Sequence, residues 1–444
     1  MMSREMKHSG IEWIGEIPKE WNICRLKDVG TLYGGLTGKA GDDFNVEEDD
    51  ISYMLYIPFT NIFNNDSINP NQLFKVKIEQ GEKQNLVQKG DLLFLMSSED
   101  YDGVGKPAIM EEQVDDLGLN SFCKGLRIYN NNTNSKFLFY LLSSHLHREL
   151  VRQEAKGFIR INLRQDRLSC CPIFLPPLPE QQKIANSLDK VCGEVDEMIA
   201  LQEQMIEELK AYKQSVITEA VTKGLNPNVP MKDSGIDWIG DVPNEWIIIM
   251  LQSLSKSIRN GYVGPTRDLF KDEGIRYIQS LHLKDGVIDF DKHHYYVSEE
   301  WANQHPKIHK DDLLIVQTGD IGQVAIVPKE YDNCNCHALI IVVLNQELCL
   351  PTYISYYLRS SVGKELLLRC KTGALLPHLN SGKIGVTPIP LPSKKEQQSI
   401  ASYLDTKCSE IDALIAIKQQ KIDELKDYKK SVIYEYVTGK KEVV

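Results

Sequence analysis

An internal repeat is the sequence feature that most constrains how this chain can fold. The segment SGIEWIGEIP spans Ser9–Pro18, and a near copy, SGIDWIGDVP, spans Ser234–Pro243. Each segment is followed closely by a further tryptophan, Trp21 in the first copy and Trp246 in the second. A match of this length, with conservative exchanges only, indicates that one unit has been duplicated within the chain.

A second repeated segment lies further along each copy. LPPLPEQQKIA begins at Leu175 and LPSKKEQQSIA begins at Leu391, so that Glu180 corresponds to Glu396. This correspondence continues without a gap as far as Thr222 in the first copy and Thr438 in the second. Each copy therefore consists of a box, a variable segment, a second box and a long continuation, in that order. The variable segment is somewhat shorter in the second copy.

The continuation after each second box is predicted to be a long helix. It lacks turn residues over about forty positions, which corresponds to ~60 Å of α-helix. Mostly apolar residues recur there at alternating steps of three and four, a spacing that keeps them on one face of the helix. This seam consists of Val195, Ile199, Gln202, Ile206, Leu209 and Val216 in the first copy, and of Ile411, Ile415, Lys418, Ile422, Leu425 and Val432 in the second.

A long helix with one narrow apolar seam needs a partner that covers the seam. The two seams match, so we predict that the helices form an antiparallel coiled coil and that the copies are related by a pseudo-twofold axis. The alternative is that each helix packs only on its own globular domain. The predicted fold class is α+β, with two mixed α/β domains separated by the two helices. The predicted segments are a box at 1–21, a variable domain at 22–178, a helix at 179–224, a linker with the repeated box at 225–246, a variable domain at 247–394 and a helix at 395–439.

The variable segments share a pattern of strands, turns and helices. Predicted strands are 91–96 and 107–110 in the first copy, and 312–317 and 324–327 in the second. In each copy a polar loop separates the two strands, a helix follows at 137–148 or 353–369, and a glycine turn comes after it at Gly157 or Gly373. The first copy has about four extra residues in the loop around 100–104, so the two copies need not use equivalent side chains.

Loops on a rigid frame are the usual place for recognition. Arginine and lysine can pair with guanine or phosphate, and asparagine and glutamine can pair with adenine. Candidate nucleic-acid contacts are Lys39, Tyr101, Lys106, Arg160, Asn162 and Arg164 in the first copy, and Arg259, Asn260, Arg267, Gln317, Gln323, Lys371, His378 and Asn380 in the second. Each of these could equally be a solvated surface side chain.

The charge distribution permits a basic surface on an acidic chain. The formal net charge is -11, but residues 151–170 carry five arginines and lysines against two acids. No run of about 18–20 apolar residues occurs, and the first residues lack the apolar core of a secretory signal. We therefore expect a cytoplasmic protein whose cysteines are reduced and which makes no contact with a membrane.

Motifs that would indicate an active site are absent from the sequence. The string from Gly34 to Ala40 is one residue too short for a phosphate-binding loop and lacks its serine or threonine. Cys334, Cys336 and His337 lack the second ligand pair of a zinc finger. No glycine-rich dinucleotide motif and no Asn-Pro-Pro-aromatic motif is present. We therefore expect no catalytic residue, no bound metal and no bound cofactor.

The paired boxes, PPLPEQQxIAxxLD ending at Asp189 with its copy ending at Asp405, and the repeated Trp-Ile-Gly segments, resemble the specificity subunit of type I restriction–modification systems. The resemblance covers nearly the whole chain. It implies that the two variable domains are target-recognition domains, each reading one half of a bipartite site in double-stranded DNA. It also implies that the helices act as a spacer and as the docking surface for two methyltransferase subunits, which bind S-adenosylmethionine and methylate adenine.

The resemblance further implies a separate restriction subunit, a motor-nuclease, in the full complex, and a role in phage defence. Two other classes of function remain open at this point. A coiled-coil adaptor that binds only proteins would explain the helices but not the divergent paired domains. A standalone restriction enzyme would require the methylation and cleavage motifs that the sequence lacks. Neither the recognised bases nor the spacer length can be read from the sequence.

Overall fold

The computed structural model describes residues 4–11, 14–46, 52–291, 293–373 and 377–443, so Trp13 of the first box lies outside the described residues. The chain divides into two units, each of which combines one variable domain with parts of both long helices. Unit 1 comprises Met1–Gln202 and Gln420–Val444, and unit 2 comprises Glu203–Gln419. Each unit is therefore built from segments that are distant in the sequence.

Unit 1 is organised around a four-stranded antiparallel sheet with the order β4-β11-β7-β9. A three-stranded sheet with the order β10-β5-β6 lies in the same unit, and β13 pairs with β3. The strands of unit 1 are β1 (Met6–His8), β2 (Glu16–Pro18), β3 (Asn22–Arg25), β4 (Gly30–Gly34), β5 (Tyr53–Ile57), β6 (Phe74–Lys77), β7 (Leu92–Leu95), β8 (Ser97–Ser98), β9 (Pro107–Ile109), β10 (Leu117–Leu119), β11 (Cys123–Ile128), β12 (Ile161–Asn162) and β13 (Pro172–Leu175).

Unit 2 repeats this arrangement with its own strands. Its four-stranded sheet has the order β17-β25-β22-β23, its three-stranded sheet the order β21-β18-β24, and β16 pairs with β28. The strands are β14 (Met231–Asp233), β15 (Asp241–Pro243), β16 (Ile247–Met250), β17 (Ser255–Asn260), β18 (Ile275–Ile278), β19 (Leu283–Lys284), β20 (Val287–Ile288), β21 (Tyr296–Val297), β22 (Leu313–Val316), β23 (Val324–Ile326), β24 (Asn335–Cys336), β25 (Leu339–Leu344), β26 (Lys371–Thr372), β27 (His378–Leu379) and β28 (Pro388–Leu391). The central strands β7 and β22 are buried throughout, as their apolar runs predict.

The predicted helices at 137–148 and 353–369 are each split in two. The structure has α2 (Ser135–Ser143) followed by α3 (His145–Glu154), and α7 (Pro351–Arg359) followed by α8 (Ser361–Leu368). The breaks fall at Ser144 and Ser360, whose hydroxyls donate to the carbonyls of the residues three positions earlier. Ser360 also accepts a hydrogen bond from the amide of Gly363, which caps the new helix. The serines, and not the apolar periodicity, determine where the chain changes direction.

The remaining helices are short. They are α1 (Phe59–Asn64), α4 (Gln165–Ser169), α6 (Glu299–Asn303) and α9 (Ser381–Ile384), together with the 3-10 turns η1 (Leu26–Asp28), η2 (Gly41–Phe44), η3 (Pro70–Gln72), η4 (Leu251–Leu254), η5 (Ser280–His282) and η6 (Lys329–Tyr331). None of the helices among the described residues is both long enough and apolar enough to cross a membrane.

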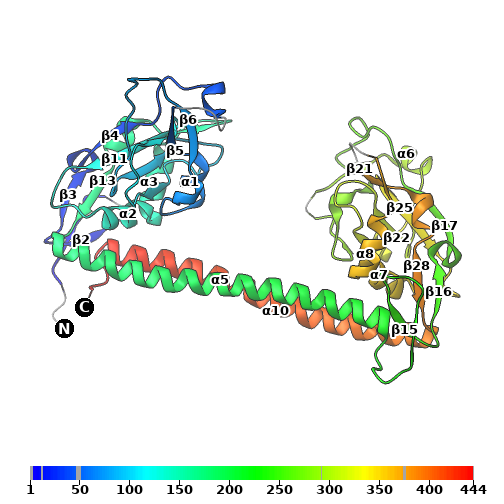
Figure 1. Ribbon diagram of the computed structural model, residues 1–444. Helices are drawn as coiled ribbons and strands as arrows, with labels where there is room; N and C mark the ends of the chain where they lie inside the picture. The colour runs from blue at the N-terminus through cyan, green and yellow to red at the C-terminus, as the bar shows by residue number, and fades with distance from the viewer. Residues whose placement is uncertain (1–3, 12–13, 47–51, 292, 374–376, 444) are drawn as a thin grey trace. The chain divides into compact units, whose positions relative to one another are not determined.

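The two long helices, α5 (Leu178–Lys223) and α10 (Lys394–Val437), run antiparallel to each other within each unit (Figure 1). In unit 1, Lys429 of α10 donates to Asp196 of α5 at 2.8 Å. In unit 2, Lys213 of α5 donates to Asp412 of α10 at 2.7 Å. In both pairs the two residue numbers add up to 625, so the helix segments of each unit have the same antiparallel register.

The seam residues lie on the inner side of these helices. All twelve are buried or half-buried, whereas their neighbours at intervening positions are largely exposed. The helices also belong to the domain cores. Leu188 and Cys192 of α5 and Val432 and Val437 of α10 pack in the core of unit 1, which also contains Trp21. The helix pair is therefore part of each domain core and not a separate module.

Each long helix ends at a glycine in the left-handed conformation, Gly224 with φ 75° and Gly439 with φ 70°. A Cβ atom at Gly439 would lie 2.4 Å from Pro18, so only glycine fits against the first box. In unit 1 the Trp21 indole N–H donates to Glu180 at 3.3 Å, and Arg4 pairs with the same carboxylate at 2.7 Å. The indole N–H of Trp246, the equivalent residue, has no hydrogen-bond partner among the described residues.

Candidate nucleic-acid interface

The strand β7 in unit 1 and the strand β22 in unit 2 lead into equivalent loops. The amide of Met96 donates to the carbonyl of Phe122 at 3.1 Å, and the carbonyl of Met96 accepts from the amide of Leu163 at 2.9 Å. Gln317 makes the same two contacts with Ala338 and Leu379, at 3.1 and 3.0 Å. The same backbone frame therefore carries methionine in one copy and glutamine in the other.

In both units a short hairpin, the one that contains the predicted glycine turn, lies against this loop. In unit 1 the hairpin places β12 beside β8, and in unit 2 it consists of β26 and β27. We define loop surface 1 as residues 97–106 and 156–164, and loop surface 2 as residues 317–323, 371–373 and 377–380. Most of the predicted nucleic-acid contacts lie on these two loop surfaces. They are Tyr101, Lys106, Arg160, Asn162 and Arg164 on surface 1, and Gln317, Gln323, Lys371, His378 and Asn380 on surface 2.

Two arginines of α3 hold the loop of surface 1 in place. Arg148 donates to the carbonyl of Asp102 at 2.7 Å, and Arg152 forms an ion pair with the Asp102 carboxylate. Burial lowers the pKa of Arg148 to about 10, a value at which the guanidinium is still charged at neutral pH. The amide of Gly103 donates to the carboxylate of Asp100 at 2.6 Å. The loop is therefore tied both to itself and to the helix behind it.

The predicted contact residues on surface 1 differ in how many hydrogen bonds and ion pairs they already form with other groups of the protein. The Lys106 ammonium donates to the carbonyls of Phe63 and Asn65 at 2.7 and 3.3 Å, and burial lowers its pKa. Arg164 is exposed but pairs with Asp166 at 3.0 Å. Tyr101 is about half exposed, and its carbonyl accepts from Arg152 at 3.4 Å.

The side chains at the tip of the hairpin form the fewest contacts with the rest of the protein among those of surface 1. The Arg160 guanidinium lies 5.1 Å from the centre of the Phe122 ring, and Asn162 donates to the carbonyl of Arg160 at 3.0 Å. Phe158 and Ile159, which the sequence analysis did not single out, are exposed at this tip. Their position directly after the repeated glycine turn is the sequence signal that could have indicated them.

Lys39 lies outside both surfaces. Its ammonium pairs with Glu82 at 2.6 Å, on a loop that also holds Gln84 against Thr37. The hydrogen bond from Lys39 is the main cause that lowers the pKa of Glu82 to about 2. The lysine side chain is itself largely covered, with 6% of its surface exposed. These contacts indicate that Lys39 stabilises the loop. Its ammonium group is therefore poorly accessible to a ligand.

On surface 2 several predicted side chains bind the protein itself. The Gln317 side chain is buried and donates to the carbonyl of Leu379 at 3.1 Å. Gln323 donates to Asp320 at 2.9 Å, and the His378 ring lies 3.1 Å from the Thr372 hydroxyl. Asn380 caps α9 by accepting from the amides of Gly382 and Lys383.

Lys371 is the exposed cation of surface 2. It lines a pocket together with the loop 318–321 and with Lys364 of α8, a residue that the sequence analysis did not single out. Two exposed ammonium groups on one pocket suit an anionic ligand such as a phosphate. Lys364 lies in a helix with an otherwise apolar inner face, so the sequence offered no signal for it.

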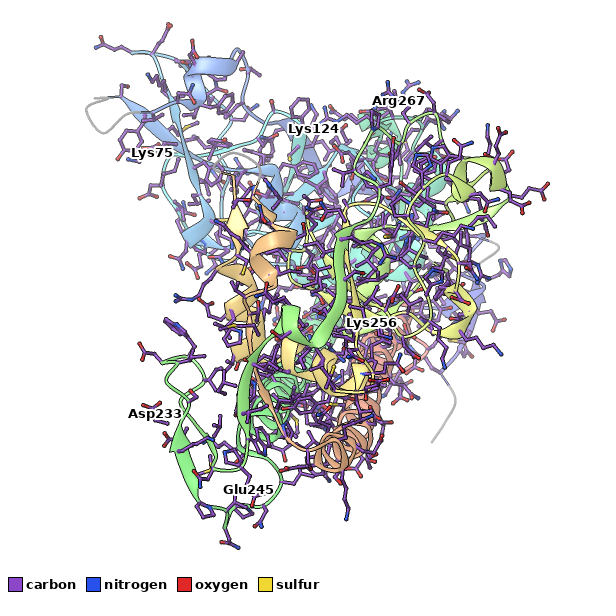
Figure 2. All side chains as sticks on the ribbon, turned by 90° about the vertical axis from the view of Figure 1, so that its right-hand side faces the viewer. Lys75, Lys124, Asp233, Glu245, Lys256 and Arg267 are labelled. Carbon is purple, nitrogen blue, oxygen red and sulfur yellow. The ribbon has the colours of Figure 1, made fainter. Side chains whose placement is uncertain are left out.

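Arg259 and Asn260 are the last two residues of the neighbouring strand β17, and Arg267 lies in the loop after it. Arg259 donates to the carbonyl of Lys307 at 2.8 Å, while Asn260 and Arg267 are exposed. The amide of Ala338 donates to the carbonyl of Tyr262, and its own carbonyl accepts from Gln317, so this end of β17 adjoins surface 2. In Figure 2 the acidic Asp233 and Glu245 lie at the lower left, on either side of the repeated box in the sequence, whereas Arg267 lies at the upper end of the view and Lys256 near its middle.

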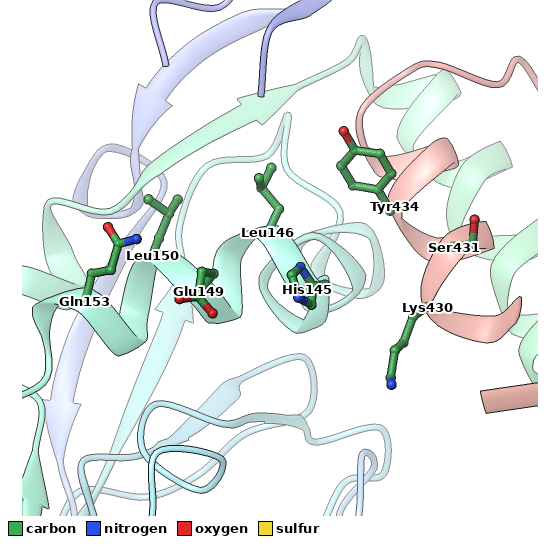
Figure 3. A pocket seen from close by; sticks show the side chains of 8 residues that line it. All are labelled: His145, Leu146, Glu149, Leu150, Gln153, Lys430, Ser431 and Tyr434. Carbon is green, nitrogen blue, oxygen red and sulfur yellow. The ribbon is translucent and has the colours of Figure 1, made fainter. Parts of the chain in front are cut away.

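A pocket in unit 1 lies between α3 and the end of α10. Figure 3 shows Leu146, Glu149 and Gln153 on α3 facing Lys430 and Tyr434 on α10. The equivalent place in unit 2 also holds a pocket, lined among others by Ser215, Thr218 and Ser361, and the hydroxyls of Thr218 and Ser361 are hydrogen bonded at 2.9 Å. Both copies therefore have a pocket at this place, with largely different side chains around it.

Exposed apolar residues on the long helices repeat between the copies. Helix patch 1, in unit 1, comprises Met198, Leu201 and Tyr428, and helix patch 2, in unit 2, comprises Leu414, Ile417 and Tyr212. The six side chains are between 45% and 60% exposed. When the two helix repeats are aligned from Glu180 and Glu396 onward, each member of one patch falls on a member of the other. In unit 1 the antiparallel register places Tyr428 opposite the residue just before Met198 on the other helix. In unit 2 it places Tyr212 opposite the residue just before Leu414. Both patches therefore have a similar composition and the same layout.

No group of three or more histidine, cysteine, aspartate or glutamate side chains is placed to hold a metal ion within the described residues. Cys334 and Cys336 are buried, and burial raises the pKa of their thiols to about 11 and about 12. These thiols are therefore protonated at neutral pH, which suits packing and not metal binding.

Comparison with known proteins gives consistent matches along the chain. The family model for the type I restriction modification DNA specificity domain matches residues 18–211 and 243–427. The putative type I restriction enzyme MjaX specificity subunit of Methanocaldococcus jannaschii is 29% identical over 442 residues, covering 96% of this chain and 95% of that protein. The EcoBI specificity subunit of Escherichia coli is 24% identical, covering 91% and 82%.

A solved structure supports the fold. One chain from a study of complex assembly and conformational transition of the type I R-M system matches with a TM-score of 0.70 at 17% sequence identity. The match covers 95% of this chain and 99% of that chain. The predicted fold class, two mixed α/β domains with long antiparallel helices, is confirmed.

Proposed function

Because this chain belongs to the type I restriction modification DNA specificity family, we propose that each of its two units reads one half of a bipartite, asymmetric site in double-stranded DNA. Within the complex it acts as the specificity subunit and supplies sequence recognition. The proposal assigns surface 1 to one half-site and surface 2 to the other.

The observation that carries this proposal is one backbone frame with two different sets of side chains. With the second boxes aligned, the hairpin positions Asn162 and Arg164 of unit 1 correspond to His378 and Asn380 of unit 2. Met96 and Gln317 likewise make the same backbone contacts. Donors and acceptors on base edges discriminate sequence, so different side chains on one frame favour different targets.

The helix patches support a second part of the proposal, the docking of two methyltransferase subunits. Two copies of one partner need two similar surfaces, and patches 1 and 2 have matching residues at equivalent positions of the helix repeat. Exposed apolar clusters of this kind mark protein interfaces. We assign S-adenosylmethionine and the methyl transfer to those partners, and propose that this chain contributes no catalytic residue. A restriction subunit would join the complex through the methyltransferases.

A domain exchange tests the proposal. Residues 22–178 are replaced with the corresponding segment of a related specificity subunit, and the full complex is expressed in a host that lacks its own adenine methylation. Methylome sequencing should show one half-site changed and the other retained. The matched control replaces residues 247–394 instead and should change the opposite half.

Two outcomes would contradict the proposal. If either exchange changed both half-sites, the units would not read independently. If the complex left the methylome unmodified and the purified chain with its partners bound no duplex, the chain would be a protein adaptor and not a DNA reader.

A further inference from the structure

The hairpin tip of loop surface 1 exposes two large apolar side chains to solvent. Phe158 is fully exposed, and Ile159 is 87% exposed. Burial of such side chains is worth about 1.5–3 kcal/mol each, so full exposure of two neighbours is unfavourable unless a ligand covers them. The other large apolar side chains exposed in the described part of unit 1 reach at most 58%.

The tip has a defined shape. The amide and carbonyl of Lys156 pair with the carbonyl and amide of Asn162 at 3.0 and 2.9 Å, which closes the hairpin. Gly157 has φ 156°, and a Cβ atom there would lie 1.9 Å from the carbonyl of Arg160. Only glycine allows this close approach. Pairing of β12 with β8 then anchors the base of the hairpin to the sheet end.

The surroundings of the tip are basic. Lys156 and Arg160 are exposed and form no ion pair with another described residue. The Arg160 guanidinium lies over the ring of Phe122, itself 53% exposed, so a cation and an aromatic face adjoin the apolar tip. Double-stranded DNA matches this combination, because its phosphates are anionic and its stacked bases have apolar faces. An apolar protein surface would leave both cations without partners.

The second copy has the same arrangement in its sequence. The hairpin of β26 and β27 also turns at a glycine with positive φ, Gly373, and the sequence continues with alanine and two leucines at 374–376. Residues 374–376 lie outside the described part of the chain, so the comparison there concerns sequence alone. In both sequences apolar residues therefore follow the glycine, although the flanking residues differ.

We propose that the Phe158–Ile159 tip acts as a wedge that inserts between adjacent base pairs of the half-site bound by unit 1. Apolar side chains inserted in this way unstack a base step and kink the duplex. Lys156 and Arg160 would contact the phosphates on either side of the opened step. The inference rests on the proposed function, and it adds a deformation of the DNA to the reading of base edges.

The test uses the full complex and a duplex with the site found by methylome sequencing. The fluorescent base 2-aminopurine is placed at successive positions along the half-site, because its emission rises when it is unstacked. The wild-type complex should show enhanced emission at one step besides the target adenine. In the double variant Phe158→Ser, Ile159→Ser the emission at that step should fall to the value of the free duplex, while the signal at the target adenine remains.

A matched control separates the wedge from a general loss of apolar surface. Phe74→Ser removes an aromatic side chain that is 56% exposed on β6 of the same unit, and it should leave the emission profile unchanged. Both variants keep every charge, so the salt dependence of binding should keep the wild-type slope.

Other results would overturn the inference. If the wild-type complex unstacked only the target adenine, or if the double variant kept the additional step, there would be no wedge. Loss of methyltransferase assembly in the double variant, with DNA binding retained, would assign the tip to a protein partner instead. Absence of duplex binding by the wild-type complex would refute the proposed function itself and is distinguishable from each of these.

Discussion

Replacing Leu201 and Tyr428 with serine removes two of the three apolar side chains of helix patch 1 and leaves helix patch 2 intact. Complete burial of such a side chain is worth about 1.5–3 kcal/mol. Since roughly half of each is still exposed, each can contribute ~1 kcal/mol on docking. The double variant should therefore weaken one of the two proposed methyltransferase sites by about 2 kcal/mol, or ~30-fold in Kd, and leave the other proposed site unchanged.

The assay is a titration of the purified methyltransferase subunit onto this chain, with complex mass read by mass photometry. At a concentration about ten times the wild-type Kd, the wild-type chain should take two subunits. Leu201→Ser with Tyr428→Ser should take one, and Ile417→Ser with Tyr212→Ser should also take one. The four-residue variant should fill each site to only about one quarter, or about half a subunit per chain on average.

Tyr403→Ser is the matched control. This tyrosine is 38% exposed on α10, but the equivalent position of the first helix repeat holds Ser187, so it belongs to no repeated patch. The control should therefore bind two subunits. The reasoning would be refuted if a variant of one patch weakened both sites equally, or if it still bound two subunits with wild-type Kd.

Two further predictions concern stability. Burial lowers the pKa of His147 to about 4, so protonation favours the unfolded state, and unit 1 should keep its full stability above about pH 6.5 and lose up to about 3 kcal/mol as the pH falls toward 4. Hydrogen exchange of β13 at pH 7 and pH 5 measures this, and unit 2, which has Gly363 at the equivalent position, is the internal control; equal losses in both units would exclude His147 as the cause. Ile422→Ala, at a seam position that is 2% exposed, should lower the free energy of unfolding by roughly 2–4 kcal/mol in a urea titration, whereas Ile417→Ala, 60% exposed, should change it by less than about 1 kcal/mol. Equal effects of the two substitutions would show that position 422 does not lie in a packed seam.

The parts of the fold that follow from periodicity could be predicted from the sequence. The helix α5 begins at Leu178 and α10 at Lys394, each one residue before the predicted start. The strands β7 and β22 fall within the predicted apolar runs. These features depend on local residue patterns, which a repeated sequence displays twice.

Features that depend on one hydrogen bond could not be predicted in this way. The serine breaks after α2 and α7 interrupt an apolar periodicity that continues through them. Lys106 donates to carbonyls 41 and 43 residues away, and Lys39 pairs with Glu82, 43 residues away. Residue type alone indicated a ligand contact at both lysines, because their protein partners are set by tertiary structure. The assignment of individual DNA contacts stays a prediction.

The composition of unit 1 from Met1–Gln202 and Gln420–Val444 has a consequence for synthesis in the cell. Val432 and Val437 belong to the core that contains Trp21 and Phe137, so the first domain cannot close its core until the last part of α10 has left the ribosome. Domains usually fold in the order in which they are translated, but here unit 2 has all its segments available first. A premature stop codon near position 420 would therefore damage the domain encoded at the start of the gene.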